Sequence, residues 1–157
     1  WAIRYPRGEA TGMDIPEGFE GMDIGKGRML REGDSVAVLS FGPIGNYTSE
    51  AAERLAEEGI EIGHYDMRFA KPLDTELLDE IADKYRHVIT LEDGCKMGGF
   101  GSAVAEYYIE KEIHPTLNIM AVPDRIVEHG SQRQLHDEVG IGPDGIVEAV
   151  RKALVQI

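Results

Sequence analysis

SVAVLSF, residues Ser35–Phe41, is a short and nearly continuous apolar run. A run of this length and composition is typical of a β-strand that is covered on both faces. Strands of that kind belong to largely parallel sheets with helices packed on either side. The run therefore predicts an α/β protein and provides a fixed point from which the rest of the chain can be interpreted.

Downstream of this run, strand and helix patterns alternate. The sequence predicts strands over residues 60–66, 87–91 and 117–122, and helices over 50–58, 75–84, 102–111, 132–138 and 144–154. Gly59 is placed to end the first helix, and Asp74 and Ser131 are placed to cap two later ones. This alternation indicates βαβ units, a largely parallel sheet and right-handed crossovers.

Upstream of the run the pattern is weaker. Residues 25–31 are compatible with a further strand, whereas residues 1–21 are rich in Gly, Pro and acidic side chains and lack periodicity. We therefore expect residues 1–22 to form the tail of a preceding domain and a linker, and residues 23–157 to form one domain. Because the chain begins at Trp1 and not at Met, we expect it to be a piece of a longer protein.

Composition narrows the functional classes. The chain has 157 residues, of which 42% are hydrophobic, which suits one globular domain. A formal net charge of −13 argues against binding to nucleic acid or to an anionic membrane surface. Apolar runs are too short to cross a bilayer, and no signal peptide is visible. Cys95 is the only cysteine, which is compatible with a reducing cytoplasm.

Two local patterns at strand ends invite a binding interpretation. Gly98-Gly99-Phe100-Gly101-Ser102 lies at a strand-to-helix turn, where backbone N–H groups can hold an anion. It is neither a dinucleotide fingerprint nor a Walker motif, and a tight turn explains the glycines better. Glu92-Asp93 ends a strand, where α/β proteins bind ligands, but a solvated turn is the favoured interpretation.

No pattern predicts a metal or nucleophile site. The five histidines form no H-E-x-x-H motif or Cys/His cluster, and no G-x-S-x-G elbow is present. Asp144-Gly145 is better explained as the start of the last helix than as a metal ligand. Arg4 and Arg7 flank Tyr5-Pro6 and could clamp a phosphate, although surface arginines are the default explanation.

Six segments, taken together, carry a family resemblance. They are IRYPRG (3–8), IGKGRMLREG (24–33), SFG (40–42), DMRFAKPLDTELL (66–78), TLEDGCKMGGFGSAV (90–104) and PDRIVEHGS (123–131). In this order they resemble the C-terminal region of the 1-deoxy-D-xylulose 5-phosphate synthase family, with DMRF-x-KPLD and PDR-x-x-EHG as the most specific parts. A looser R-x-x-x-PLD pattern also occurs in transketolases and 2-oxo-acid dehydrogenase beta subunits, which remain alternatives.

The resemblance implies a fold and a reaction. The fold would be a three-layer α/β/α sandwich on a five-stranded, mixed but mostly parallel sheet, as in transketolase C-terminal domains, with residues 25–31 as the antiparallel strand. The reaction would join pyruvate and D-glyceraldehyde 3-phosphate into 1-deoxy-D-xylulose 5-phosphate and CO₂, for isoprenoid, thiamine and pyridoxal synthesis. The enzyme would be a cytoplasmic homodimeric transferase that uses thiamine diphosphate and Mg²⁺.

This chain lacks the GDG…N motif that binds the diphosphate and Mg²⁺ in the family. We therefore expect it to hold neither cofactor nor metal, to carry no catalytic residue, and to partner the upstream domains of the same enzyme. Arg7 resembles the second arginine of the family's YPRG segment, which implies contact with the phosphate of glyceraldehyde 3-phosphate. A purely structural role in assembly, or a stand-alone anion-binding module, remain the competing hypotheses.

Overall fold

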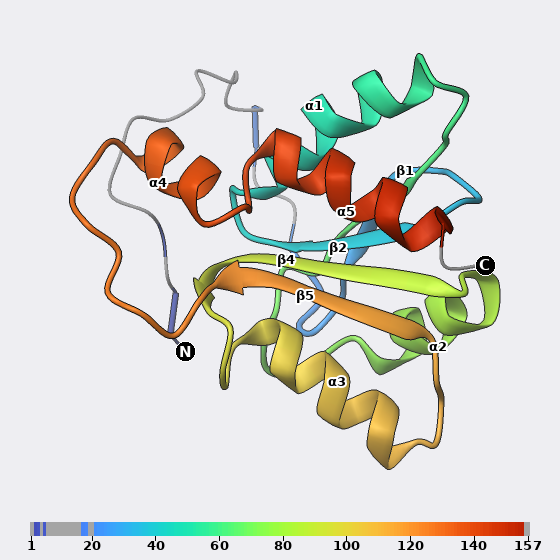
Figure 1. The fold of residues 1–157 in the computed structure, drawn as a ribbon. Coiled ribbons are helices and arrows are strands. Elements are labelled where there is room, and N and C mark those ends of the chain that lie inside the picture. The colour runs from blue at the N-terminus through green and yellow to red at the C-terminus, as the bar shows by residue number, and fades with distance from the viewer. Residues whose placement is uncertain (1, 4, 6–16, 19–20, 156–157) are drawn as a thin grey trace.

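The computed structural model describes residues 2–3, 5, 17–18 and 21–155. Its sheet has five strands in the order β1-β3-β2-β4-β5, and β5 and β1 form its two edges (Figure 1). The strands are β1 (Arg28–Arg31), β2 (Ala37–Phe41), β3 (Gly63–Asp66), β4 (His87–Cys95) and β5 (Thr116–Val122). Only β1 runs antiparallel to its neighbour, so the expected mixed, mostly parallel sheet is confirmed.

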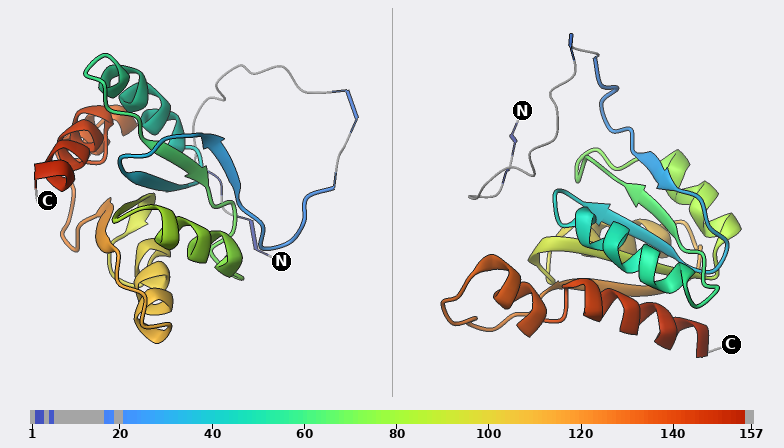
Figure 2. Two further views of the ribbon diagram at one scale, coloured as in Figure 1. Left: turned by 90° about the vertical axis from the view of Figure 1, so that its right-hand side faces the viewer. Right: turned by 90° about the horizontal axis from the view of Figure 1, so that it is seen from above.

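Helices cover both faces of this sheet (Figures 1 and 2). One layer contains α1 (Gly45–Ala56) and α5 (Pro143–Val155), with the short α4 (Gln132–Glu138) beside them. The opposite layer contains α2 (Thr75–Lys84) and α3 (Phe100–Glu110). The expected three-layer sandwich is therefore confirmed. The connection from β2 to β3 runs toward β1 and places α1 on one face, whereas the connections from β3 to β4 and from β4 to β5 run the other way and place α2 and α3 on the opposite face. Right-handed crossovers require this change of face.

The apolar run Ser35–Phe41, which contains β2, is buried on both faces of the sheet, as its composition predicts. Val36 and Val38 pack into the core under α1 and α5, whereas Ala37 and Leu39 pack into the core above α2 and α3. All four side chains are fully buried. Burying a side chain of the size of Leu39 stabilises the fold by about 2 kcal/mol, so this strand anchors both cores.

The expected capping residues lie where the sequence places them. Gly59 has φ of 78°, and the amide N–H groups of Gly59 and Ile60 donate to the carbonyls of Ala56 and Leu55, both at 3.0 Å. This pattern is a Schellman motif, which needs a left-handed residue and so favours glycine. Asp74 accepts a hydrogen bond from the Leu77 amide at 3.2 Å and caps α2.

Most boundaries lie within three residues of expectation, and two elements, α1 and β4, differ by more at one end. Helix α1 begins at Gly45 rather than at Glu50. Its first turn packs closely on β2: a Cβ on Gly45 would lie 2.6 Å from Ser40 Oγ. Strand β4 runs to Cys95 rather than to Leu91. Its extension buries Glu92 and Gly94, residue types that a local pattern assigns to a turn.

Candidate functional site

The segments that carry the family resemblance converge at one edge of the sheet. Strands β2, β3, β4 and β5 are parallel, and their carboxyl ends lead into SFG, DMRF, LEDG and PDR, respectively. In open α/β sheets ligands bind outside these ends, where neighbouring strands send their connections to opposite faces. Here that point lies between β2, followed by α1, and β4, followed by α3 (Figure 1).

Side chains of this chain occupy the region between the carboxyl ends of β2 and β4. The rings of Phe41, at the end of β2, and Phe100, at the start of α3, stack with centroids 5.3 Å apart. Glu92 is 4% exposed, and its two carboxylate oxygens accept hydrogen bonds from the amides of Phe100 at 3.0 Å and Gly101 at 2.9 Å. The expectation of a solvated turn at Glu92 is therefore wrong, because tertiary packing folds this carboxylate over the helix N-terminus.

The glycine-rich turn owes its composition to this packing. A Cβ on Gly99 would lie 2.6 Å from Oε1 of Glu92, and a Cβ on Gly101 would lie 2.5 Å from Thr90 Oγ1. Side chains at these positions would displace the carboxylate or separate α3 from the sheet. A tight turn with φ of 73° explains Gly98, whereas close packing explains Gly99 and Gly101. The amides of Phe100 and Gly101, which could have held an external anion, already bond Glu92.

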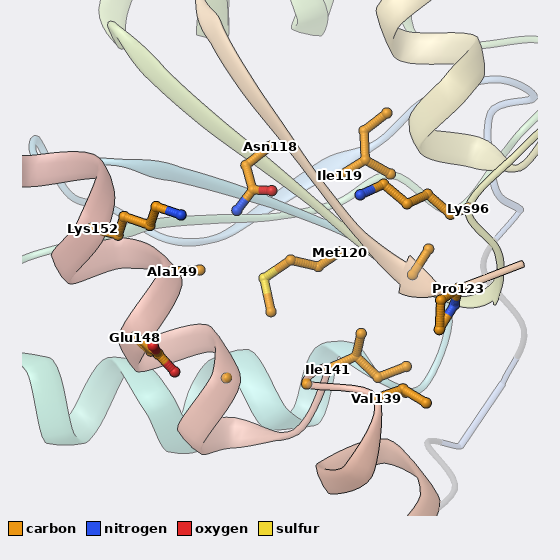
Figure 3. A pocket seen from close by; sticks show the side chains of 13 residues that line it. Lys96, Asn118, Ile119, Met120, Pro123, Val139, Ile141, Glu148, Ala149 and Lys152 are labelled. Atoms are coloured by element: carbon orange, nitrogen blue, oxygen red, sulfur yellow. The ribbon is translucent and has the colours of Figure 1, made fainter. Parts of the chain in front are cut away.

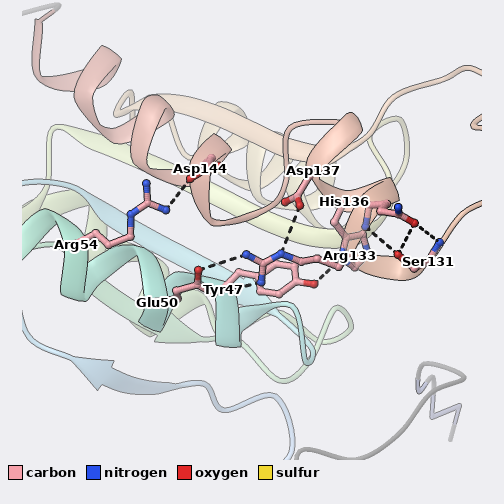
Figure 4. A network of polar contacts seen from close by, with 9 residues as sticks. Tyr47, Glu50, Arg54, Ser131, Arg133, His136, Asp137 and Asp144 are labelled. Atoms are coloured by element: carbon pink, nitrogen blue, oxygen red, sulfur yellow. Dashed lines mark hydrogen bonds and ion pairs between the residues drawn. The ribbon is translucent and has the colours of Figure 1, made fainter.

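A histidine that sequence reasoning left without a role joins α4 to α1 and to β4, and Figure 4 shows its contact with Tyr47 of α1. His136 of α4 is 6% exposed, with Nδ1 3.3 Å from the Tyr47 hydroxyl and Nε2 3.3 Å from Asp93 Oδ1. The guanidinium of Arg133 lies 4.8 Å from the centre of the Tyr47 ring and bonds Glu50 at 3.3 Å. These contacts hold α4 against α1 and the end of β4.

Replacing His136 with Phe should release α4 without unfolding the domain. Phe keeps the ring volume but removes both polar contacts, and this seven-residue helix buries only His136. Short elements with few buried contacts open locally, below the global unfolding free energy. We expect faster amide hydrogen exchange in residues 132–138 and little change in β2 and β4. His129→Phe, at an exposed position in the preceding loop, is the control; equal exchange in both variants would contradict the role of His136.

A second buried histidine pairs with the SFG segment. His64 of β3 is 1% exposed, and its Nε2 lies 2.9 Å from Ser40 Oγ. Burial lowers the pKa of His64 from 6.5 to about 4, although the nearby Asp66 carboxylate acts in the opposite direction. Local patterns predicted a strand over both residues without indicating that they meet, since their pairing depends on the alignment of β2 with β3.

The DMRF and PLD segments make structural contacts. The Asp66 carboxylate lies 3.0 Å from Nη2 of Arg28 and accepts a 3.3 Å hydrogen bond from the Arg68 amide, which helps hold Arg68 at φ of 54°. Asp74, besides capping α2, accepts a 2.9 Å hydrogen bond from the Gly27 amide. These acidic groups therefore attach the antiparallel edge of the sheet to the loop that follows β3.

The remaining expectations concern the arginines near the N-terminus, metal binding and membrane spans. Arg4 and Arg7 lie outside the described residues, as does most of the segment 1–22. Within residues 2–3, 5, 17–18 and 21–155, no group of three or more His, Cys, Asp and Glu is arranged to hold a metal ion. Over the same ranges, no helix is both long and apolar enough to span a bilayer.

The fold is an α/β/α sandwich domain whose own side chains occupy the carboxyl edge of its sheet. Comparison with known families identifies which family of such domains it belongs to. The model for "Transketolase, C-terminal domain" matches residues 25–146, so the chain belongs to that family. The chain is also similar over nearly its whole length to proteins named 1-deoxy-D-xylulose-5-phosphate synthase. Identity is 48% to the one from Cytophaga hutchinsonii, across 96% of this chain, and 44% to the one from Rippkaea orientalis, across 95%.

The chain spans about a quarter of the length of these relatives: 24% in both cases. Solved structures support the fold. A "Split gene transketolase, inactive beta4 tetramer" superposes on 90% of this chain and 46% of its own, with a TM-score of 0.77 and 35% identity. A transketolase variant from Pichia stipitis covers 82% of this chain and 18% of its own, with a TM-score of 0.61 and 15% identity.

Proposed function

We propose that this chain is the C-terminal part of an enzyme that makes 1-deoxy-D-xylulose 5-phosphate from pyruvate and D-glyceraldehyde 3-phosphate. The observation that carries the proposal is the 40–48% identity to synthases of that name across at least 95% of the chain. Transketolases and 2-oxo-acid dehydrogenase beta subunits are less favoured, because the similar proteins compared above over nearly the whole chain carry the synthase name.

Thiamine diphosphate and Mg²⁺ belong to the proposed activity, but the described residues of this chain do not fit them. The glycine-rich helix N-terminus that could receive a diphosphate has its amides bonded to the buried Glu92 carboxylate. The site between β2 and β4 is filled by the stacked rings of Phe41 and Phe100. We therefore assign the cofactor to upstream domains, and we derive no chemical step from this chain.

Within the enzyme, we propose that the carboxyl edge packs against those upstream domains. The loops after β4 and β5 present Met97, which is 71% exposed, and Ile126, which is 94% exposed. Apolar side chains this exposed, in loops of a region held together by buried polar contacts, suit an interface between domains. The described contacts of Glu92 and His136 keep these loops in place, so the chain acts here as a scaffold.

The proposed direct contribution to substrate binding is Arg7, which would contact the phosphate of glyceraldehyde 3-phosphate. Replacing Arg7 with Ala in the complete enzyme should raise KM for this substrate by about tenfold to a hundredfold, because charge-assisted hydrogen bonds contribute about 1.5–3 kcal/mol. KM for pyruvate should change little, since pyruvate carries no phosphate. Steady-state kinetics with each substrate varied in turn measures both.

Arg4→Ala is the matched control, since Arg4 flanks the same Tyr5-Pro6 pair. An equal rise in KM for both substrates in Arg7→Ala would indicate general damage and contradict the contact. Unchanged kinetics would leave the chain with its scaffold role alone. The homodimer, the cytoplasmic location and the division at residue 22 stay predictions.

A further inference from the structure

The two edges of the sheet differ in the side chains that they expose. Strand β5 borders a cavity of about 360 Å³ against α5, and the polar side chains of Asn118, Glu148 and Lys152 lie around it (Figure 3). Among the described residues, no large apolar side chain of β5 is exposed. Exposed apolar side chains gather instead at the opposite edge, which β1 forms.

Four apolar side chains form a patch at β1 and just before it. Of the ten large apolar side chains that are exposed among the described residues, four lie within residues 22–30: Met22, Ile24, Met29 and Leu30. Met29 is 53% exposed and Leu30 is 48% exposed, and neither packs against the two core clusters of the described residues. Exposed apolar side chains that gather in one place mark a contact surface. We call these four side chains the edge patch.

Strand β1 is bulged, but its bulge does not protect the edge. Met29 pairs with Tyr65 and Arg31 pairs with His64, so Leu30 is an extra residue in the ladder. Natural sheets shield their edge strands with bulges that turn the edge away and with outward charges. Here the extra residue is a half-exposed leucine, which adds apolar surface to the edge.

The charges of β1 are neutralised by the domain itself. Nη2 of Arg28 lies 3.0 Å from the Asp66 carboxylate, and Nη2 of Arg31 lies 2.7 Å from the Glu61 carboxylate. Both guanidinium groups therefore already have an acidic partner on this domain. A partner that covers the edge patch needs apolar side chains and no added acidic groups.

The segment that leads into β1 is fixed in place. The Gly27 amide donates a 2.9 Å hydrogen bond to Asp74, and Nζ of Lys26 lies 3.4 Å from the same carboxylate. A Cβ on Gly25 would lie 2.8 Å from Cγ of Pro72, so this segment packs closely on the loop before α2. The surface is therefore formed before any partner binds, which lowers the entropy lost on binding.

The occupant follows from how this domain is connected in the proposed enzyme. The chain spans 24% of the length of the relatives compared above, and the C-terminal domain model matches from residue 25 onward. Under the proposed function, the rest of the enzyme is joined to this domain through the residues directly before β1. A connection of about 20 residues holds the preceding domain within roughly 25 Å, which corresponds to a millimolar effective concentration.

A second copy of the chain is a less favourable occupant. A symmetric antiparallel pairing centred on β1 would place Arg28 of one copy opposite Arg31 of the other, at both ends of the strand. Like charges directly opposite each other destabilise a pair of strands. A second copy also lacks the effective concentration that a connecting segment provides.

We propose that the preceding domain of the same enzyme packs an apolar surface on the edge patch. The inference rests on the proposed function, which makes this chain the C-terminal part of a longer protein. It adds a second contact to the one proposed at the loops after β4 and β5, which lie across the sheet from β1. Two contacts on separate sides of the sheet fix the orientation of a domain, whereas a single contact leaves it free to rotate.

Amide hydrogen exchange of residues 22–31, measured in the 157-residue chain and in the complete enzyme, tests this contact. We expect exchange to be at least about tenfold slower in the complete enzyme, because the preceding domain excludes water from the edge patch. Equal exchange in the two proteins would overturn the proposal. Exchange that slows when the 157-residue chain is concentrated, together with dimers in analytical ultracentrifugation, would assign the patch to a second copy and also overturn it.

Leu30→Lys in the complete enzyme provides the matched variant. A lysine places a charge in an apolar contact, so the protection of residues 22–31 should be lost. Ile109→Lys, at an exposed position of α3, is the control and should leave this protection unchanged. Full protection in Leu30→Lys would contradict the contact.

Two further measurements separate the causes of a negative result. The melting temperature of the 157-residue chain should be the same with and without Leu30→Lys, since Leu30 lies outside both core clusters. A large decrease would show that Leu30 supports the domain itself and would overturn its role at an interface. Synthase activity with pyruvate and D-glyceraldehyde 3-phosphate is assayed separately: its absence would remove the proposed function, whereas the exchange comparison would still decide the contact.

Discussion

Replacing Glu92 with Ala should lower the free energy of unfolding by about 3 kcal/mol. The substitution removes both acceptors from the amides of Phe100 and Gly101 and leaves these N–H groups in a buried site. It also removes a negative charge from the positive end of the α3 dipole. Two lost charge-assisted bonds, a lost charge–dipole interaction and a cavity all act in the same direction, which makes this the largest single-residue effect that we expect at the carboxyl edge.

Urea denaturation of the chain, followed by circular dichroism, measures this loss. Glu92→Gln should fall between the wild type and Glu92→Ala, because it keeps the shape and one carbonyl acceptor. Glu106→Ala is the matched control: it removes the same side chain from an exposed position of the same helix and should change stability by less than about 0.5 kcal/mol. If Glu92→Ala proved as stable as this control, the carboxylate would not be the cap of α3.

The second large effect is a pH dependence that originates at His64. The pKa of this imidazole is lowered from 6.5 to about 4 by burial, so the folded chain resists its protonation. Between these two values the unfolded state binds more protons than the folded state. Stability therefore falls as the pH falls from about 6.5 to about 4, is fully present above that window, and loses about 3 kcal/mol across it.

The measurement is the unfolding free energy at several pH values across this window, compared with His64→Gln. The glutamine amide can reach Ser40 Oγ, as Nε2 of His64 does at 2.9 Å, but it does not titrate in this range. The slope should be shallower in the variant by the contribution of one proton. Carboxylates titrate equally in both proteins, so parallel slopes would assign the effect to other groups.

Local sequence was sufficient for much of the fold. The apolar run at β2 indicated a strand buried on both faces, because a run this short and nearly continuous is typical of a strand with helices on either side. Asp74, Ser131 and Gly59 marked helix ends, since capping depends on groups within a few residues of one another. Local sequence indicated the first strand only weakly, because its four residues are mostly exposed, and its antiparallel direction came from the family resemblance.

The functional edge was less predictable. Glu92 reads locally as a solvated turn, yet it is buried because α3 begins eight residues later and returns its amides to the carboxylate. His136 meets Tyr47 across 89 positions of sequence, and His87 meets Thr116 only through strand pairing. Neither contact has a periodic signature, so no pattern within a single segment could have indicated it.

Composition, periodicity and capping residues thus determined the class of fold and most element boundaries, since each depends on interactions between residues close in the chain. The family followed from the resemblance of six sequence segments. Tertiary structure decided which polar groups are buried: a carboxylate on a helix N-terminus, a histidine between two helices and another at the start of β4. The physical reason is that burial and hydrogen bonding depend on which strands and helices become neighbours, and this protein joins residues separated by tens of positions.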